Sequence, residues 1–184
     1  MIERLIKNIA KCLSEEKIPY MIIGGQAVLL YGTPRLTRDI DITLGVDTDK
    51  FSLIEKVCRK LKLKILPEDP IDFVRTTKVL PAEDVKLRIR VDFIFSFTQY
   101  EAQAIKRSKR VLINGYPVKF ASCEDIIIHK MLAARAIDEE DIKNILIKNK
   151  NSIDVRYIKK WLGEFSNIDE YKGIVQKFNS LLKQ

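Results

Sequence analysis

The stretch that decides the fold is residues 20–44, YMIIGGQAVLLYGTPRLTRDIDITL. It begins with the apolar run 20–23, which predicts a buried strand, and Gly24-Gly25 predict a sharp turn directly after it. A short helix is expected from Gln26 to Tyr31, and a second apolar run over residues 40–44 predicts another strand. The stretch therefore predicts two strands that are connected through a glycine turn and a helix.

Three aspartates are the candidate catalytic residues. Asp39 and Asp41 are two residues apart on a predicted strand, so their side chains leave the same face about 6.6 Å apart. Like charges so placed repel each other unless a cation lies between them. Asp92 is a third acid, in the alternating strand predicted for residues 86–95. If the two strands are neighbours at about 4.8 Å, all three carboxylates converge.

These acids favour a hard divalent cation. The chain has one histidine and three widely spaced cysteines, which argues against a Cys/His centre and leaves carboxylates as metal ligands. Oxygen ligands suit Mg²⁺ (or Mn²⁺), and two such ions activate a hydroxyl and stabilise a leaving pyrophosphate. Gly24 and Gly25 offer a phosphate cradle, because their backbone N–H groups are accessible and a helix begins there. The alternative is a pair of solvated acids and an ordinary glycine turn.

The remaining pattern predicts an α/β (α+β) fold, a mixed β-sheet core flanked by helices with a C-terminal helical extension. The core is expected over residues 1–122, and residues 123–184 are expected to pack on it as helices. Further expected elements are helices over 2–16 and 50–63, a strand over 73–80, a hairpin of 110–113 and 117–121 around Asn114-Gly115, and a helix capped by Ser122.

The amino-acid composition indicates which classes of binding partner to expect. Of 184 residues, 46% are hydrophobic and 32% are charged, which is typical of a globular protein. No apolar run reaches the roughly 18 residues of a membrane span, and the N-terminus lacks a secretory pattern, so the expected location is cytoplasmic with no membrane partner. The net charge of +8 favours polyanions such as nucleic acid or nucleotides. The densest basic cluster, residues 106–110, has a solvated loop as its alternative.

The motif around these residues resembles a known family. IGGQA at residues 23–27 followed by R-x-T-x-DIDI at residues 35–42 resembles the signature of the nucleotidyltransferase-fold superfamily, which includes DNA polymerase beta. The likeness is greatest to the minimal nucleotidyltransferase and AbiEii-like toxin branches. Many members have Gly-Ser where this chain has Gly24-Gly25, whereas AbiEii-like members often have Gly-Gly.

The resemblance implies roles for the quoted residues. It implies that Asp39 and Asp41 bind catalytic Mg²⁺ and that Asp92 is the third metal-site acid, which activates the acceptor hydroxyl. Gly24 and Gly25 would hold the triphosphate.

Arginines and a threonine lie near these acids in the sequence. Arg35 and Thr37, in the loop before the acidic strand, are further nucleotide-binding candidates, and an ion pair with Asp39 is the alternative for Arg35. Arg88 and Arg90 share the expected face of the later strand with its acid, and both substrate contact and plain solvent exposure stay open for them.

A second segment, residues 124–142, resembles the helical motif that follows the core in the same branch. By this likeness Lys130 contacts nucleotide phosphates, where an ammonium acts as a compact point charge, and Asp138 helps to position it. The alternative is a surface charge network of Lys130, Arg135, Asp138 and Asp141.

The resulting hypothesis is an enzyme that transfers a nucleoside monophosphate from a nucleoside triphosphate to an acceptor hydroxyl. The acceptor stays open. One alternative is a macromolecule, namely transfer RNA, another RNA or a protein, as in AbiEii-like toxins, and in that case a cognate antitoxin is the expected partner. The other alternative is a small molecule of the aminoglycoside or lincosamide type. A non-catalytic nucleotide- or partner-binding member of the fold is the remaining alternative.

Overall fold

The structure is a computed structural model that describes residues 1–34, 36–96 and 98–183. It divides into two compact units. The first comprises Met1–Gln26 and Leu36–Ala121, and the second comprises Ala27–Arg35 and Ser122–Gln184. The predicted fold class is confirmed, because helices flank a mixed sheet and further helices follow it. The expected packing of the C-terminal helices on the core stays a prediction.

The first unit contains a mixed sheet with the strand order β3-β4-β5-β2-β1-β7-β6 in the described residues. The pairs β2–β5 and β1–β7 are parallel, and the other neighbours are antiparallel. The strands are β1 (Tyr20–Ile23), β2 (Asp39–Leu44), β3 (Lys64–Ile65), β4 (Val79–Asp84), β5 (Ile89–Phe95), β6 (Lys109–Ile113) and β7 (Tyr116–Phe120). The edges of the sheet are therefore the two-residue strand β3 and the hairpin strand β6.

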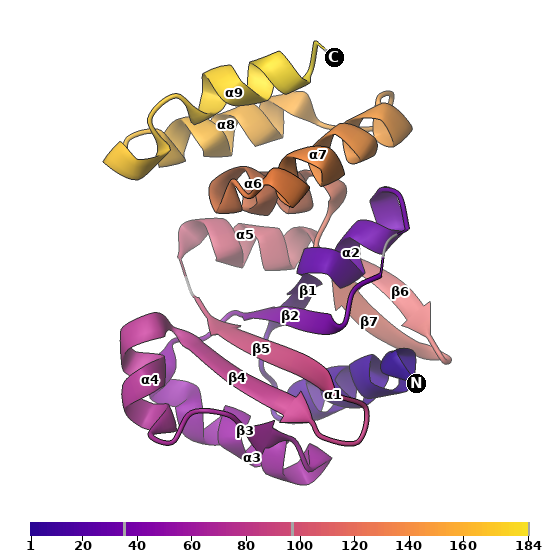
Figure 1. The fold of residues 1–184 in the computed structure, drawn as a ribbon, viewed down its shortest axis with the longest axis vertical. Coiled ribbons are helices and arrows are strands. Elements are labelled where there is room, and N and C mark those ends of the chain that lie inside the picture. The colour runs from indigo at the N-terminus through magenta and orange to yellow at the C-terminus, as the bar shows by residue number, and fades with distance from the viewer. Residues whose placement is uncertain (35, 97, 184) are drawn as a thin grey trace. The chain divides into compact units, whose positions relative to one another are not determined.

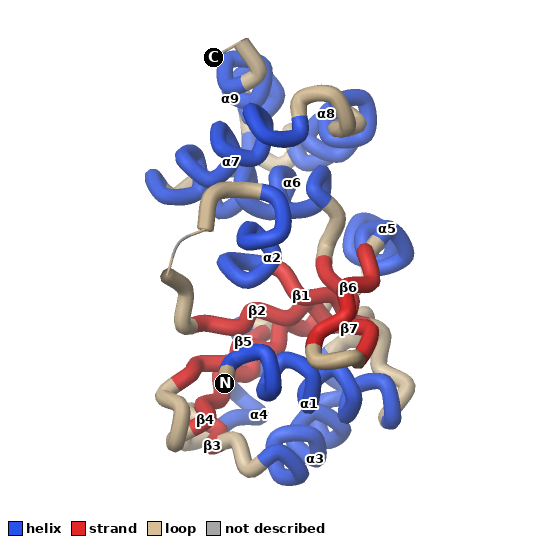
Figure 2. Tube along the Cα trace, turned by 90° about the vertical axis from the view of Figure 1, so that its right-hand side faces the viewer, coloured by secondary structure: helices blue, strands red, loops and turns tan. Residues whose placement is uncertain are grey.

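Helices cover this sheet. They are α1 (Ile2–Glu15), α3 (Phe51–Leu61), preceded by the 3₁₀ turn η1 (Thr48–Lys50), α4 (Pro70–Thr77) and α5 (Gln99–Arg107). Figures 1 and 2 show α1 and α3 on one side of the sheet and α5 on the other. The alternating residues Ile40, Ile42, Val91 and Phe93 of the two central strands are fully buried. Because side chains alternate along a strand, the residues between them point to the opposite face.

The strand predicted for residues 73–80 is wrong over its first part. Residues 73–77 belong to α4, and the strand β4 begins only at Val79. The segment contains β-branched residues, which are common in strands, but a helix start precedes them. The Asp69 carboxylate accepts a hydrogen bond from the backbone N–H of Asp72, and Pro70 occupies the first turn.

The strand predicted for residues 86–95 begins three residues later than expected. Residues 85–88 form the turn between β4 and β5. Asp84 Oδ1 accepts hydrogen bonds from the backbone N–H groups of Lys86 and Leu87, and Arg88 has a positive φ of 52°. Arg88 is therefore a turn residue, not a strand residue.

Helix α5 was not predicted, whereas the hairpin around Asn114-Gly115 is confirmed.

The second unit is helical. It contains most of α2 (Gly24–Tyr31), together with α6 (Cys123–Ala133), α7 (Ala136–Asn149), α8 (Val155–Phe165), the 3₁₀ turn η2 (Asp169–Tyr171) and α9 (Ile174–Leu181). Helix α6 packs against α7, α8 and α9. The side chain of Asn149 donates a hydrogen bond to the carbonyl of Tyr31 at 2.9 Å, and Lys148 donates to that of Gly32 at 2.8 Å. These contacts join α7 to the end of α2.

The first turn of α6 is held by a buried polar cluster. Ser122 Oγ accepts a hydrogen bond from the backbone N–H of Asp125 and donates one of 2.6 Å to its carboxylate. Tyr157 Oη donates a further hydrogen bond of 2.8 Å to the other oxygen of that carboxylate. The cap predicted at Ser122 is thus confirmed.

In the described part of the chain, no helix combines the length and apolarity that crossing a bilayer requires. Cys12, Cys58 and Cys123 are free thiols, as their spacing predicted.

Replacing Ser122 with alanine removes the cap of α6 and one partner of the buried Asp125. We expect the free energy of unfolding to fall by about 1–2 kcal/mol, the usual cost of losing a serine cap. Urea unfolding followed by circular dichroism measures this change. Ser152→Ala is the matched control, because the hydroxyl of Ser152 is exposed and, among the described residues, bonds only the carbonyl of Asn149. An equal loss in both variants would contradict the role of the cap.

Candidate active site

The register of two parallel strands brings two of the predicted acids together. Strand β2 pairs with β5 so that Asp41 lies opposite Asp92 and Asp39 lies opposite Arg90. Neighbouring strands are about 4.8 Å apart, so Asp41 and Asp92 are side by side on one face of the sheet. Asp39 is exposed, and Asp41 and Asp92 are partly buried. The three candidate acids thus share a face, with two of them in direct register.

The glycine turn lies directly against Asp41. Gly24 has a positive φ of 62°, and a Cβ atom built on it would overlap the Asp41 carboxylate, 2.8 Å from its Cγ. A Cβ atom on Gly25 would lie 2.9 Å from the Cβ of Thr37. Neither position has room for a side chain while Asp41 and Thr37 stay in place. Arg35, the other candidate in this loop, lies outside the described residues.

The first turn of α2 begins at this site. Because α2 starts at Gly24, the backbone N–H groups of its first turn have no partner within the helix, and the positive end of the helix dipole is located there. Gln26, which is 7% exposed, donates a hydrogen bond of 3.3 Å from Nε2 to the carbonyl of Asp39. This bond links the start of the helix to the start of β2. In the sequence Gln26 stood out only as part of the IGGQA motif and as the expected start of a helix, and its hydrogen bond to Asp39 was not predicted.

Arg90 holds one of the acids. Its Nε donates to both carboxylate oxygens of Asp92, at 2.8 and 3.0 Å. These hydrogen bonds, followed by the charges of Asp92, Asp39 and Asp41, raise the pKa of Arg90 above its ordinary value. The sequence left Arg90 open between substrate contact and exposure to water, and the structure shows a third arrangement. The signal was available, since residues two apart on a strand share a face.

The acids do not form a closed metal cage. Within residues 1–34, 36–96 and 98–183, no group of three His, Cys, Asp or Glu side chains is close enough to hold a metal ion as the side chains stand. The donor set nevertheless fits a hard cation, because it consists of carboxylate oxygens in adjacent strand positions beside a turn without side chains. In this arrangement the Asp92 carboxylate is hydrogen-bonded to the guanidinium of Arg90.

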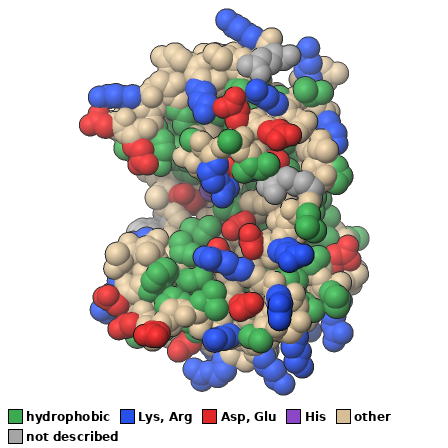
Figure 3. Space-filling view, in the orientation of Figure 1, with side chains coloured by type: hydrophobic (Ala, Val, Ile, Leu, Met, Phe, Trp, Pro, Cys, Tyr) green, Lys and Arg blue, Asp and Glu red, His purple; other side chains and the backbone are tan. Residues whose placement is uncertain are grey.

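Surface charge does not form one uniform basic field on the side drawn in Figure 3. Lys and Arg side chains are spread over this face of the described residues and lie beside Asp and Glu side chains. On this face, positive side chains are thus mixed with negative ones rather than gathered in one patch.

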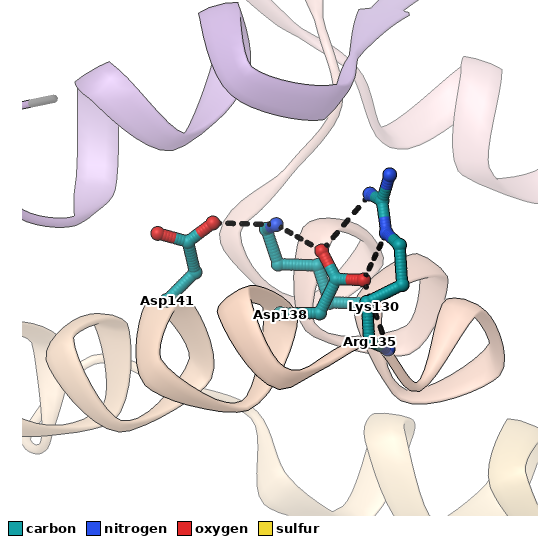
Figure 4. A network of polar contacts seen from close by, with 4 residues as sticks. All are labelled: Lys130, Arg135, Asp138 and Asp141. Atoms are coloured by element: carbon teal, nitrogen blue, oxygen red, sulfur yellow. Dashed lines mark hydrogen bonds and ion pairs between the residues drawn. The ribbon is translucent and has the colours of Figure 1, made fainter. Parts of the chain in front are cut away.

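The second segment singled out from the sequence forms a buried charge network, which Figure 4 shows from close by. Lys130 Nζ lies 2.8 Å from Asp138 Oδ1 and 2.7 Å from Asp141 Oδ2. Arg135 Nε lies 2.7 Å from Asp138 Oδ2, and the backbone N–H of Arg135 donates to the same oxygen. Asp138 is fully buried, and Lys130 is only 5% exposed.

Asp138 stays ionised in this network. Burial alone would raise the pKa of its carboxyl, but the hydrogen bonds from Arg135 and Lys130 outweigh burial and leave the pKa below its ordinary value. The expected charge network therefore forms with the expected members, but Lys130 and both aspartates are buried in the second unit, whereas the Arg135 side chain is 70% exposed. A phosphate contact by Lys130 stays a prediction, and it would require one of the two carboxylates to release the ammonium.

A mixed sheet with paired acids beside a glycine turn defines a class, the nucleotidyltransferase fold, and solved structures of that class are similar to this chain. The antibiotic-resistance factor ANT(2'')-Ia is 21% identical, with coverage of 97% of this chain and 91% of its own and a TM-score of 0.57. In complex with adenylyl-2''-tobramycin, ANT(2'')-Ia matches with 20% identity, 97% coverage of both chains and a TM-score of 0.56. An antigenic nucleotidyltransferase-like protein from Paracoccidioides brasiliensis is 18% identical, and the match covers 95% of this chain and 91% of that protein, with a TM-score of 0.57.

At these identities the structural likeness shows the fold. The family is shown by the sequence itself, because residues 2–180 match the model of the family described as "Nucleotidyl transferase of unknown function (DUF2204)". The chain belongs to this family and is a nucleotidyltransferase, as the resemblance of its motif implied. No curated protein sequence shows a significant match to it.

Gly24→Ala tests the close approach of the turn to Asp41. We expect the rate of nucleotidyl transfer to fall at least about tenfold, because a displacement of roughly 1 Å in a reacting group can cost far more than that. Gly115→Ala is the matched control, since Gly115 also has a positive φ, of 76°, but a Cβ atom there would meet nothing within 4 Å. Both variants should lose about 1–2 kcal/mol of stability from backbone strain. Equal transfer rates in the two variants would refute the link to Asp41.

Lys130→Met tests the buried network. The substitution leaves Asp138 and Asp141 without their shared cation, so we expect the free energy of unfolding to drop by about 3–5 kcal/mol. Lys143→Met is the comparison, because Lys143 forms a half-exposed pair with Glu139 at 3.5 Å and should cost less than about 1 kcal/mol. Chemical denaturation of both variants at neutral pH gives the two values. Similar stabilities would show that the network contributes little.

Proposed function

We propose that this protein transfers a nucleoside monophosphate from a nucleoside triphosphate to an acceptor hydroxyl, with Mg²⁺ or Mn²⁺ held by Asp39, Asp41 and Asp92. The observation that carries the proposal is the register of β2 and β5, which sets Asp41 beside Asp92 immediately next to the Gly24 turn. Two adjacent carboxylates are costly without a cation, and a turn without side chains leaves room for a phosphate.

The residues of the chain have separate tasks in this proposal. The backbone N–H groups of Gly24 and Gly25, at the positive end of α2, bind the triphosphate. Gln26 fixes the first turn of α2 to β2 through the carbonyl of Asp39, so the phosphates and the acids keep their spacing. The Asp92 carboxylate accepts the proton of the attacking hydroxyl. Thr37, which lies against Gly25, and Arg35 are assigned to the nucleotide as well. When bound, a divalent cation supplies electrostatic stabilisation of the charge that develops on the phosphate oxygens.

The proposed acceptor is an RNA hydroxyl. The net charge of +8 favours a polyanion over a polycation. This argument disfavours an aminoglycoside, which carries several amino groups, although ANT(2'')-Ia shares the fold. A cytoplasmic location and a cognate antitoxin partner, as in AbiEii-like toxins, belong to the same proposal and rest on the likeness of the motif alone.

Asp41→Asn tests the proposal directly. The purified protein is incubated with each α-labelled nucleoside triphosphate, Mg²⁺ and total RNA. We expect label on RNA from the wild type and at least about a hundredfold less from Asp41→Asn, because metal-assisted charge stabilisation is worth several kcal/mol. Asp49→Asn is the matched control, since Asp49 is an exposed acid that pairs only with Lys50 among its described contacts.

The other outcomes are equally informative. Label on protein or on an added aminoglycoside, and none on RNA, would replace the proposed acceptor and keep the reaction. Full activity in Asp41→Asn, or in the presence of excess chelator, would refute the metal site. No transfer to any acceptor would refute the proposed reaction.

A further inference from the structure

The proposed function gives Asp92 two tasks that its present contact obstructs. A carboxylate that holds a cation or accepts a proton needs free lone pairs, yet both oxygens of Asp92 receive hydrogen bonds from Arg90 Nε. The side chain of Asp92 is 18% exposed, so the pair is shielded from water on the carboxylate side. Such a charge-assisted contact is stronger than a hydrogen bond between neutral groups.

The position of Arg90 in the sheet surrounds it with acids. Across β2 its register partner is Asp39, and across β4 its register partner is Glu83. On its own strand Asp92 follows two residues later, on the same face. Arg90 therefore occupies a place where three carboxylates need a positive charge. The guanidinium meets that need only while no stronger cation is present.

We infer that Arg90 is the resident counter-cation of the acidic site and that it competes with the divalent cation for Asp92. This inference rests on the proposed function. With Arg90 in place, the site keeps its like charges together and binds a free divalent cation weakly. The cation is then bound well only together with nucleotide phosphates, whose negative charge supplies the ligands that Asp92 does not.

The side chain of Arg90 has the freedom that this task requires. It is 53% exposed, so the guanidinium can leave Asp92 without disturbing the packed core. Its neighbours Ile89 and Val91 on the opposite face are buried and hold the strand in place. Movement of the Arg90 side chain thus makes the Asp92 carboxylate available to another cation while the sheet stays unchanged.

Binding of Mn²⁺ to the nucleotide-free protein tests the inference. The signal of free Mn²⁺ in electron paramagnetic resonance gives the dissociation constant of each variant. We expect Arg90→Met to bind Mn²⁺ about threefold to tenfold more tightly than the wild type, the range of a partly exposed ion pair. Arg90→Lys keeps the charge but not the planar donor, and its affinity should lie between the two.

Two controls identify the cause. Arg88→Met removes the same charge from the neighbouring exposed arginine in the turn, and it should leave the affinity unchanged within about twofold. In an Asp92→Asn background, Arg90→Met should have no effect, because the carboxylate for which the cations compete is gone. Thermal unfolding of each variant verifies that the protein is folded.

The results separate this inference from the proposed function. If the wild type binds Mn²⁺, Asp41→Asn loses it, and Arg90→Met binds it no better or more weakly, the inference is overturned and the metal site stands. An equal gain in Arg88→Met also overturns it, since the effect would then be one of general charge. If neither the wild type nor Arg90→Met binds Mn²⁺, the inference is overturned, and the metal dependence of the proposed function is decided by nucleotidyl transfer in the presence of excess chelator.

Discussion

The parallel pairing of β2 with β5 is the constraint on which the rest of the site depends. It brings Asp41 and Asp92 into register, and two carboxylates at that spacing repel each other. Buried alternating residues such as Ile40 and Phe93 fix the pairing, because slipping by one residue would turn the apolar side chains out of the core. The hydrophobic core thus supplies the energy that keeps the acids together.

The two units handle buried charge in opposite ways. In the second unit, Lys130 and Arg135 balance Asp138 and Asp141, and both carboxylates are buried although the Arg135 side chain is 70% exposed. In the first unit, Arg90 balances Asp92 at a partly exposed position, with further acids nearby. The buried carboxylates of the second unit are suited to stabilising a helix junction. The partly exposed Asp92 is a carboxylate that another cation can reach.

Sequence reasoning succeeded where the signals were local. The strands around Gly24-Gly25, the Asn114-Gly115 hairpin and the cap at Ser122 follow from turn and cap chemistry within a few residues. It failed at residues 73–77, where the cap at Asp69 begins a helix in place of the expected strand, and it missed α5. The neighbourhood of Asp41 and Asp92 could be proposed only on the condition that their strands pair. The burial of Asp138 could not be predicted, because an acid in the first turn of a helix is usually solvated.

The edges of the sheet have a consequence for how the molecule behaves among copies of itself. One edge is β3, only two residues long, and the other is β6, which begins with the exposed residues Lys109 and Arg110. An open edge is a template on which a strand from another molecule can add, and short length and positive charge both oppose that addition. A crowded solution of this protein is therefore protected against growth of the sheet from one chain into the next.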